Sequence, residues 1–192
     1  MAVLAVGAML WNMDTDSTTI EPSGSCDGKW CRGGVDAPVT IDVYPDFDCH
    51  VCVEKERMVL EALDIYPGLV RMVYHPYPSS ALGQMLAEAL EASGEQGRFW
   101  ELHDRFLQHV PGEMSELRPY AAEIGLDMQK FDEALNSGKF EDKVELAKQE
   151  AISQGVKQVA VFINGKEYQE YPGTLSDLRA AIDEELKRME AR

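Results

Sequence analysis

Two cysteines separated by two residues, Cys49 and Cys52, are the best candidates for chemistry in this 192-residue chain. An apolar run rich in β-branched residues precedes them and a segment with helical spacing follows, so we expect a strand to end and a helix to begin there. The unpaired N–H groups and positive dipole end of a helix N-terminus favour a thiolate. Cys49 is therefore predicted to be the nucleophile. Cys52, one turn further in and more buried, would resolve a mixed disulfide.

The same pair is open to other interpretations. A zinc site needs four ligands, and Cys26 and Cys31 are the obvious second pair. Covalent haem attachment requires a histidine directly after the second cysteine, where Val53 stands. A structural Cys-x-x-Cys disulfide closes too small a loop to gain much stability. We favour a redox pair, and expect neither a metal nor a cofactor.

His50 and Val51 lie between the two cysteines and are expected to modulate the thiolate. A protonated His50 adds positive charge beside Cys49, which stabilises the thiolate and makes the disulfide more oxidising. The alternative is a solvent-facing loop histidine without a redox role.

The elements that would position this pair are predicted in the order β-α-β, a helical block, then β-β-α. The first strand–helix–strand run is short enough for a βαβ unit with a right-handed crossover. Asn164–Gly165 is a hairpin turn, and Thr174 with Asp177 is a helix-capping pair. The predicted strands are 37–44, 69–75, 158–163 and 166–171, and the predicted helices are 49–66, 80–93, 97–109, 115–124, 127–137, 139–154 and one from residue 174.

This order predicts an α/β fold: a mixed sheet covered by helices, with an all-helical insertion between its halves. Residues 35–78 and 155–192 would form the sheet domain, and residues 79–154 the insertion. Residues 1–34 are interpreted as an apolar leader or anchor remnant, too short to span a bilayer, followed by a polar tether. For Cys26 and Cys31, in this tether, we favour a local surface disulfide. A second redox pair, metal binding and free thiols are the alternatives.

Composition narrows the possible partners and the compartment. The net charge is −16, which disfavours nucleic acid and anionic membrane surfaces as partners. Four cysteines in two close pairs fit an oxidising, extracytoplasmic compartment better than the cytosol. His75, His103 and His109 are interpreted as structural or surface residues.

Four segments resemble the DsbA-like thiol–disulfide oxidoreductases, thioredoxin-fold proteins with a helical insertion. They are GVDAPVTIDVYPDFDCHVC, LVRMVYHPYP, GEQGRFWELHDRF and ISQGVKQVAVFINGK, in the family's order between about residues 34 and 186. The resemblance implies that Cys49 is the nucleophilic cysteine and Cys52 its partner. It also implies protein or peptide thiols and disulfides as substrates, and a separate redox partner protein.

Two positions depart from that family. Its cis-proline, packed against the active disulfide, would fall at Val159, with Gln158 before it; a one-residue gap would place it at Ala160. Because a cis bond without proline costs about 2.5–4 kcal/mol, we expect a trans bond. Val43 replaces a buried acid of the first strand, and Asp42 is on the opposite face. Proton transfer to Cys52 is therefore expected to differ.

The sequence thus predicts an extracytoplasmic thiol–disulfide oxidoreductase, tethered to a membrane through its N-terminal segment. The direction of electron flow is left open. The alternative is a non-catalytic thioredoxin-like module, altered at the cis-proline loop, that binds a partner or a metal.

Overall fold

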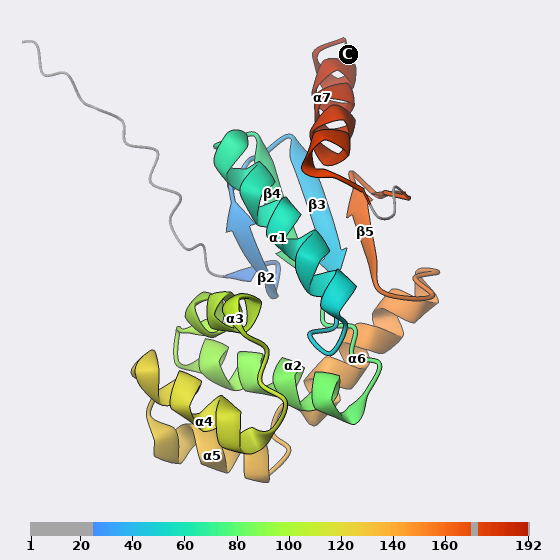
Figure 1. Cartoon of the computed structure of the whole chain (residues 1–192). Coiled ribbons are helices and arrows are strands. Elements are labelled where there is room, and N and C mark those ends of the chain that lie inside the picture. Colours follow the sequence, from blue (N-terminus) through green and yellow to red (C-terminus); the bar gives the residue numbers. More distant parts are fainter. Residues whose placement is uncertain (1–24, 170–172, 192) are drawn as a thin grey trace, which may run out of the picture.

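A computed structural model describes residues 25–169 and 173–191 of the chain (Figure 1). Its centre is a six-stranded mixed sheet in the order β1-β2-β4-β3-β5-β6. Only β3 and β4 are parallel to each other, and the other neighbouring pairs are antiparallel. The strands are β1 Ser25–Cys26, β2 Lys29–Gly33, β3 Val39–Tyr44, β4 Val70–Tyr74, β5 Ala160–Ile163 and β6 Lys166–Glu167.

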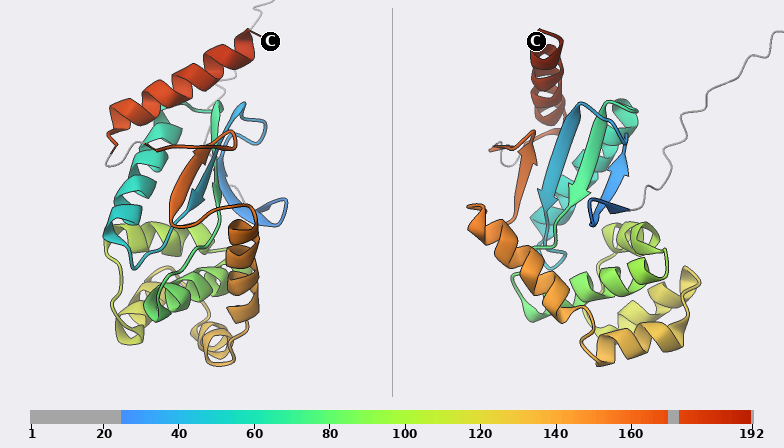
Figure 2. Two further views of the ribbon diagram at one scale, coloured as in Figure 1. Left: turned by 90° about the vertical axis from the view of Figure 1, so that its right-hand side faces the viewer. Right: turned by 180° about the vertical axis from the view of Figure 1, so that it is seen from behind.

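The predicted βαβ unit is formed by β3, the helix α1 (His50–Ile65) and β4. Alternate residues of β3 are buried, with Val39 and Ile41 fully enclosed, because successive side chains of a strand point to opposite faces. The C-terminal helix α7 (Leu175–Glu190) lies with α1 on the same side of the sheet (Figure 2). This layer carries Cys49 and Cys52.

The helical insertion lies beyond one end of the sheet, next to the N-terminal end of α1 (Figure 1). Its core includes the buried aromatic residues Phe99, Trp100 and Phe106, whose helical spacing places them on one face. Asp127 caps one of its helices, since its side chain accepts hydrogen bonds from backbone N–H groups of the first turn. The insertion helices are α2 Ala81–Glu95, α3 Phe99–Gln108, α4 Met114–Glu123, α5 Met128–Asn136 and α6 Glu141–Ser153.

The chain then returns to the sheet through the predicted hairpin. Asn164 and Gly165 both have positive φ angles, 48° and 76°, as a two-residue primed turn requires. The strand after it, β6, is shorter than the predicted 166–171: it ends at Glu167, and residues 170 and 171 lie outside the described residues. The capping box of Thr174 and Asp177 at the start of α7 is confirmed.

The predicted tether is wrong for residues 25–33. These residues form a β-hairpin, and its second strand, β2, pairs antiparallel with β4. The turn is Asp27–Gly28, with φ angles of 52° and 78°, and an Asp-Gly pair is a strong hairpin signal that the interpretation as a tether overlooked. The sheet therefore begins about ten residues earlier than the predicted boundary at residue 34. The apolar leader lies outside the described residues.

Tertiary packing explains why this hairpin joins the sheet. Trp30 of β2 stacks on Phe99 of α3, with ring centroids 4.4 Å apart. Its indole Nε1 donates a hydrogen bond to the buried Glu91 carboxylate of α2 at 3.0 Å. A large aromatic side chain with a satisfied N–H group contributes strongly to packing. The hairpin thus connects the sheet to the insertion.

Candidate active site

Cys49 is the N-cap residue of α1, as predicted. Its backbone is extended, with φ −118° and ψ 101°, and its Sγ accepts a hydrogen bond from the Cys52 backbone N–H at 3.3 Å. A sulfur in this position faces the unpaired N–H groups of the first helical turn, so a thiolate there is stabilised.

Cys49 and Cys52 form a disulfide, with Cα atoms 5.3 Å apart. The Cys52 side chain is buried, with 6% of the residue exposed, whereas Cys49 is only partly buried. An attacking thiol therefore has access to Cys49 before Cys52. This difference agrees with the roles predicted for the two residues.

The loop before Cys49 is held by Asp46, a buried carboxylate that we did not single out in the sequence. Its Oδ2 accepts hydrogen bonds from the Ser79 backbone N–H at 2.8 Å and hydroxyl at 2.5 Å. Its backbone carbonyl accepts the Cys49 N–H at 3.0 Å. Gly83 of α2 packs so closely on the Asp46 carboxylate that a Cβ atom would collide with it. The insertion thus supports the loop that presents Cys49.

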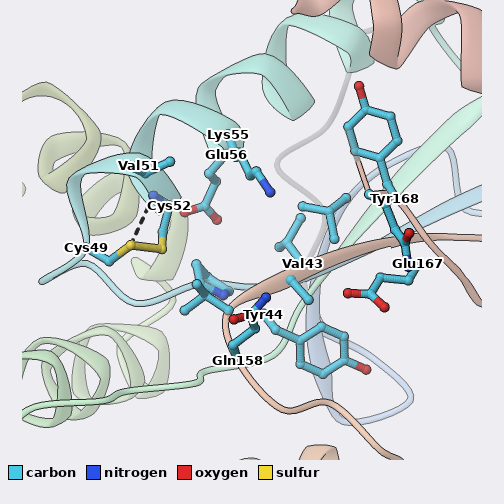
Figure 3. Close-up of a pocket in the computed structure, with 15 residues that line it drawn as sticks. Val43, Tyr44, Cys49, Val51, Cys52, Lys55, Glu56, Gln158, Glu167 and Tyr168 are labelled. Carbon is cyan, nitrogen blue, oxygen red and sulfur yellow. Dashed lines mark hydrogen bonds between the residues drawn. A yellow bond between two sulfur atoms is a disulfide. The ribbon is translucent and has the colours of Figure 1, made fainter. Parts of the chain in front are cut away.

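A pocket of about 550 Å³ opens beside the disulfide (Figure 3). Val51, which is 37% exposed, lines its α1 side together with the two cysteines. The three residues predicted at the cis-proline position form part of another wall: Gln158, Val159 and Ala160. They line the same pocket as the two cysteines, and their equivalence to the cis-proline loop stays a prediction. The trans bond stays a prediction.

Val43 and Asp42 of β3 lie as their alternation indicated. Val43 is buried and contributes an apolar side chain to the pocket. Asp42 is on the opposite face, where its Oδ1 lies 2.8 Å from His75 Nε2. The strand therefore supplies no carboxylate to the pocket near Cys52.

The α1 helix supplies that carboxylate instead, at Glu56, a residue that our sequence analysis missed. Glu56 is 2% exposed and lines the pocket. Its Oε1 lies 3.0 Å from His103 Nε2 on α3. Its Oε2 is also buried, and accepts no hydrogen bond from any residue in the described ranges 25–169 and 173–191. The available signal was its position four residues after Cys52, on the same helix face.

His103 continues a chain of charged groups behind Glu56. Its Nδ1 lies 3.0 Å from Asp104 Oδ1, and Arg32 donates two hydrogen bonds to the Asp104 carboxylate at 2.9 and 2.8 Å. Burial alone would lower the pKa of His103, but the Glu56 charge and hydrogen bonds to both carboxylates raise it. Burial would raise the pKa of Asp104, but hydrogen bonds from His103 and Arg32 and their charges lower it. His103 therefore carries the structural role expected for it, and also contacts a pocket residue.

Two further side chains near the cysteines differ in their surroundings. Lys55 lines the pocket, and burial lowers its pKa while the Glu167 charge opposes that shift. His50 is exposed and lines a separate depression with Phe47 and Arg57, not the pocket. Its modulating effect on the thiolate stays a prediction.

Cys26 and Cys31 form the other disulfide, across the β1–β2 hairpin, with Cα atoms 5.9 Å apart. Cys31 is buried and Cys26 is partly buried. The pairing agrees with the favoured local disulfide, although Cys31 lies in the sheet and not on the surface of a tether.

A metal-binding cluster and a membrane-spanning helix are both absent from the residues that the structure describes. Among them, no three His, Cys, Asp or Glu side chains are grouped so that they could hold a metal ion. Within the same residues, none of the helices combines the length and apolar composition needed to cross a bilayer.

Comparisons with known proteins identify the family. The family model described as thioredoxin matches residues 26–184. The Na(+)/H(+) antiporter NhaA 3 of Salinispora tropica is 36% identical over 163 residues, which is 79% of this chain and 24% of the antiporter. The NhaA 1 antiporter of Salinispora arenicola is 40% identical over 112 residues, 54% of this chain and 16% of that protein. The chain thus spans about a quarter or less of these curated relatives.

Solved structures share the fold. A thioredoxin-like oxidoreductase from Silicibacter pomeroyi superposes with a TM-score of 0.73 at 19% identity, covering 84% of this chain and 94% of the other. Oxidised BdbD from Bacillus subtilis gives 0.71 at 19% identity, with coverages of 85% and 96%. Reduced DsbA from Mycobacterium tuberculosis gives 0.61 at 24% identity, with coverages of 80% and 85%. The predicted thioredoxin-like fold with a helical insertion is confirmed.

Proposed function

Because this chain belongs to the thioredoxin family, we propose that it is an extracytoplasmic thiol–disulfide oxidoreductase that exchanges disulfides with protein cysteines. Cys49 is the nucleophile and Cys52 the resolving cysteine. The observation that carries the proposal is the Cys49–Cys52 disulfide, which lies at the N-terminus of α1 with Cys49 accessible and Cys52 buried. The solved DsbA and BdbD structures of the same fold support this activity.

The geometry fits a reversible exchange in two steps. A substrate thiolate attacks Cys49 Sγ, the Cys49–Cys52 bond breaks, and Cys52 leaves as a thiolate while the substrate is joined to Cys49. A second substrate thiolate then releases the oxidised substrate, and Cys49 leaves as a thiolate stabilised by the N-terminus of α1. In the opposite direction the same steps reduce a substrate disulfide.

The pocket beside the disulfide suits part of a polypeptide. Its apolar surface comes from Val43, Val51 and Val159. Charges of both signs come from Lys55 and Glu167. Binding sites of this kind combine an apolar surface with a few polar groups that orient the ligand. We propose that a substrate segment carrying the reacting cysteine lies across this pocket.

The compartment and the partners are part of the proposal. Two disulfides within one small chain are typical of oxidising compartments outside the cytoplasm. A redox partner protein that restores the Cys49–Cys52 pair after each turnover, and a membrane tether supplied by the apolar leader within residues 1–34, also stay predictions. The sodium–proton exchange named for the antiporter relatives is not part of the proposal, because the chain spans so little of their length.

Single-cysteine variants test the assignment. The reduced wild-type chain is mixed with a peptide that contains a disulfide, and the products are trapped with acid and identified by mass spectrometry. Cys49→Ala should abolish exchange at this pair, whereas Cys52→Ala should accumulate the peptide joined to Cys49. Exchange that survives the loss of Cys49 would show that the assignment is wrong. Titration of the Cys49–Cys52 pair against glutathione then sets the direction of electron flow.

The alternative is a non-catalytic module that binds a partner or a metal. It predicts stoichiometric zinc in the purified chain and no reversible dithiol couple. The oxidoreductase predicts a reversible two-electron couple. Measuring the metal content and the redox potential of one preparation separates the two.

A further inference from the structure

We infer that Glu56 exchanges a proton with Cys52 during disulfide exchange. This inference rests on the proposed function, because it concerns the step in which the Cys49–Cys52 bond breaks or forms. Cys52 reacts as a thiolate when that bond forms or breaks, and is a thiol while the bond is open, so it must lose a proton before the bond forms and gain one after it breaks. Its burial restricts access of bulk water and disfavours the thiolate.

The position of Glu56 brings its carboxyl group to the side of Cys52. Residues four apart on a helix lie on one face, with Cβ atoms about 5–6 Å apart. Cys52 and Glu56 both line the pocket. Figure 3 shows the Glu56 carboxylate and the disulfide facing this same pocket.

The hydrogen bonding of Glu56 leaves one oxygen available for a proton. Oε1 lies 3.0 Å from His103 Nε2, but Oε2 accepts nothing from the described residues. A buried carboxylate oxygen without a donor is costly, and native structures contain few of them. Retaining one beside a reactive cysteine points to a role in the reaction.

Other titratable groups of the site are less suitable. Four carboxylates are buried among the described residues, and of these only Glu56 lines the pocket; the others are Asp46, Glu91 and Glu185. Glu167 lines the pocket but is exposed. Lys55 is on the same helix, and it interacts with the Glu167 charge. Tyr74, behind Glu56, keeps its proton because burial and the Glu56 charge raise its pKa well above the usual value.

His103 and Asp104 make the proton transfer possible without leaving a bare charge in the core. When Glu56 is ionised, it faces His103. Burial lowers the pKa of this histidine, but its two carboxylate partners raise that pKa more strongly. When Glu56 takes up a proton, His103 is still paired with Asp104, which Arg32 neutralises. A buried charge that always has a partner costs far less than an isolated one.

The step balances in both directions. When Cys52 resolves a mixed disulfide, its thiol proton passes to the Glu56 carboxylate, and the thiolate attacks Cys49 Sγ. The Cys49–Cys52 bond forms and the substrate leaves as a thiolate. When a substrate thiolate opens the enzyme disulfide, Cys52 leaves as a thiolate and takes the proton from the Glu56 carboxyl group. Two electrons pass between enzyme and substrate, and the proton stays within the site until solvent equilibrates it.

The test follows the two cysteines separately. A Cys26→Ser/Cys31→Ser background is reduced and mixed with an aromatic disulfide whose released thiolate absorbs visible light. Attack by Cys49 releases the first thiolate, and attack by Cys52 on the resulting mixed disulfide releases the second. With Glu56→Gln at about pH 6, the second release should be slower by about ten-fold or more; full general-base catalysis contributes roughly 100- to 10,000-fold. The difference should shrink as the pH rises, because hydroxide then offers a second route for taking the Cys52 proton.

The matched control is Glu91→Gln, which neutralises a carboxylate of similar burial outside the pocket. It should leave both releases unchanged. The inference fails if Glu56→Gln keeps the wild-type pH profile, if it slows both releases equally, or if Glu91→Gln has the same effect. If the background chain releases no thiolate through Cys49 at any pH, the proposed function fails as well, which distinguishes the two failures.

A measurement on the unaltered chain covers the case in which Glu56→Gln does not fold. The ¹³C resonance of the Glu56 carboxyl group is followed by NMR against pH in the oxidised and reduced states. In the reduced state the chemical shift of this carbon should change a second time, at the pH at which Cys52 ionises. That second change should be absent when the disulfide is closed. Identical titration curves in the two states would overturn the inference.

Discussion

The two disulfides of this chain have similar spans but different surroundings. Their Cα–Cα distances are 5.3 Å for Cys49–Cys52 and 5.9 Å for Cys26–Cys31. Cys49 caps a helix beside a pocket, whereas Cys31 lies in β2, whose backbone groups pair with β4. The reactivity of a cysteine follows from the charge and access around its sulfur. We therefore expect disulfide exchange at the first pair and hairpin closure at the second.

Removing each pair in turn should give the largest contrast. Cys49→Ala should lower the exchange rate with a peptide disulfide on the order of 1,000-fold or more, because the attacking sulfur is gone. Cys26→Ser/Cys31→Ser should change it by less than about two-fold, because this hairpin is not part of the helix terminus that activates Cys49. Stopped-flow rates at one pH measure both. A comparable loss in the second variant would instead make Cys26–Cys31 a second redox pair.

Two glycines of α2 pack against different parts of the molecule, one beside each cysteine pair. A Cβ at Gly83 would meet the Asp46 carboxylate that holds the Cys49 loop, and one at Gly94 would meet the Trp30 ring of the hairpin. Alanine at either position should lower the free energy of unfolding by about 1–3 kcal/mol through overpacking. Only Gly83→Ala should also slow exchange. Urea unfolding and peptide exchange measure the two effects.

Gly112→Ala is the control for the two glycine variants, because its Cβ would meet only Glu116 Oε2, at an ordinary 3.6 Å. It should be nearly neutral in both measurements. Equal slowing of exchange by Gly83→Ala and Gly94→Ala would mean that the insertion does not support the Cys49 loop separately from the hairpin.

Opening the hairpin disulfide should have a moderate effect on stability. Cys26 and Cys31 close a loop of about six residues, for which the chain-entropy model gives about 2 kcal/mol. Cys26→Ser/Cys31→Ser should therefore unfold at lower urea concentration by a corresponding amount. An unchanged midpoint would show that Trp30 and the β2–β4 pairing hold the hairpin without the disulfide.

The smallest expected effects are on pH-dependent stability near the Cys49–Cys52 pair. The pKa of His103 is raised in the folded chain, since the carboxylates outweigh burial, so its stabilisation is complete below the unfolded pKa of about 6.5. That stabilisation is lost as the pH rises through the folded value. Asp104 has a lowered pKa, so its contribution is lost in acid, as the pH falls through its folded value.

Urea unfolding at a series of pH values checks both signs. His103→Gln should remove the decline on the alkaline side, while Arg32→Gln should weaken the acid-side contribution of Asp104. An alkaline decline that is unchanged in His103→Gln would assign it to another group.

Much of the site could be predicted from local sequence. The Cys-x-x-Cys pair, the strand before it and the helix after it are adjacent in the chain, so their relative positions follow from short-range rules. The same holds for the turn at Asn164–Gly165 and for the alternation of Asp42 and Val43. The hairpin at 25–33 was predictable from the local turn signal at Asp27–Gly28, so the interpretation of this segment as a tether was wrong.

The sequence by itself determined where the reactive sulfur would lie, because a helix terminus is a local structure that the nearby residues specify. Only the tertiary structure decided which groups surround it. Glu56 meets His103 from 47 positions away, and Asp46 meets Ser79 from 33. Contacts of that range depend on how the insertion packs against the sheet, and Glu56 is a buried carboxylate beside the pocket only because that packing excludes water.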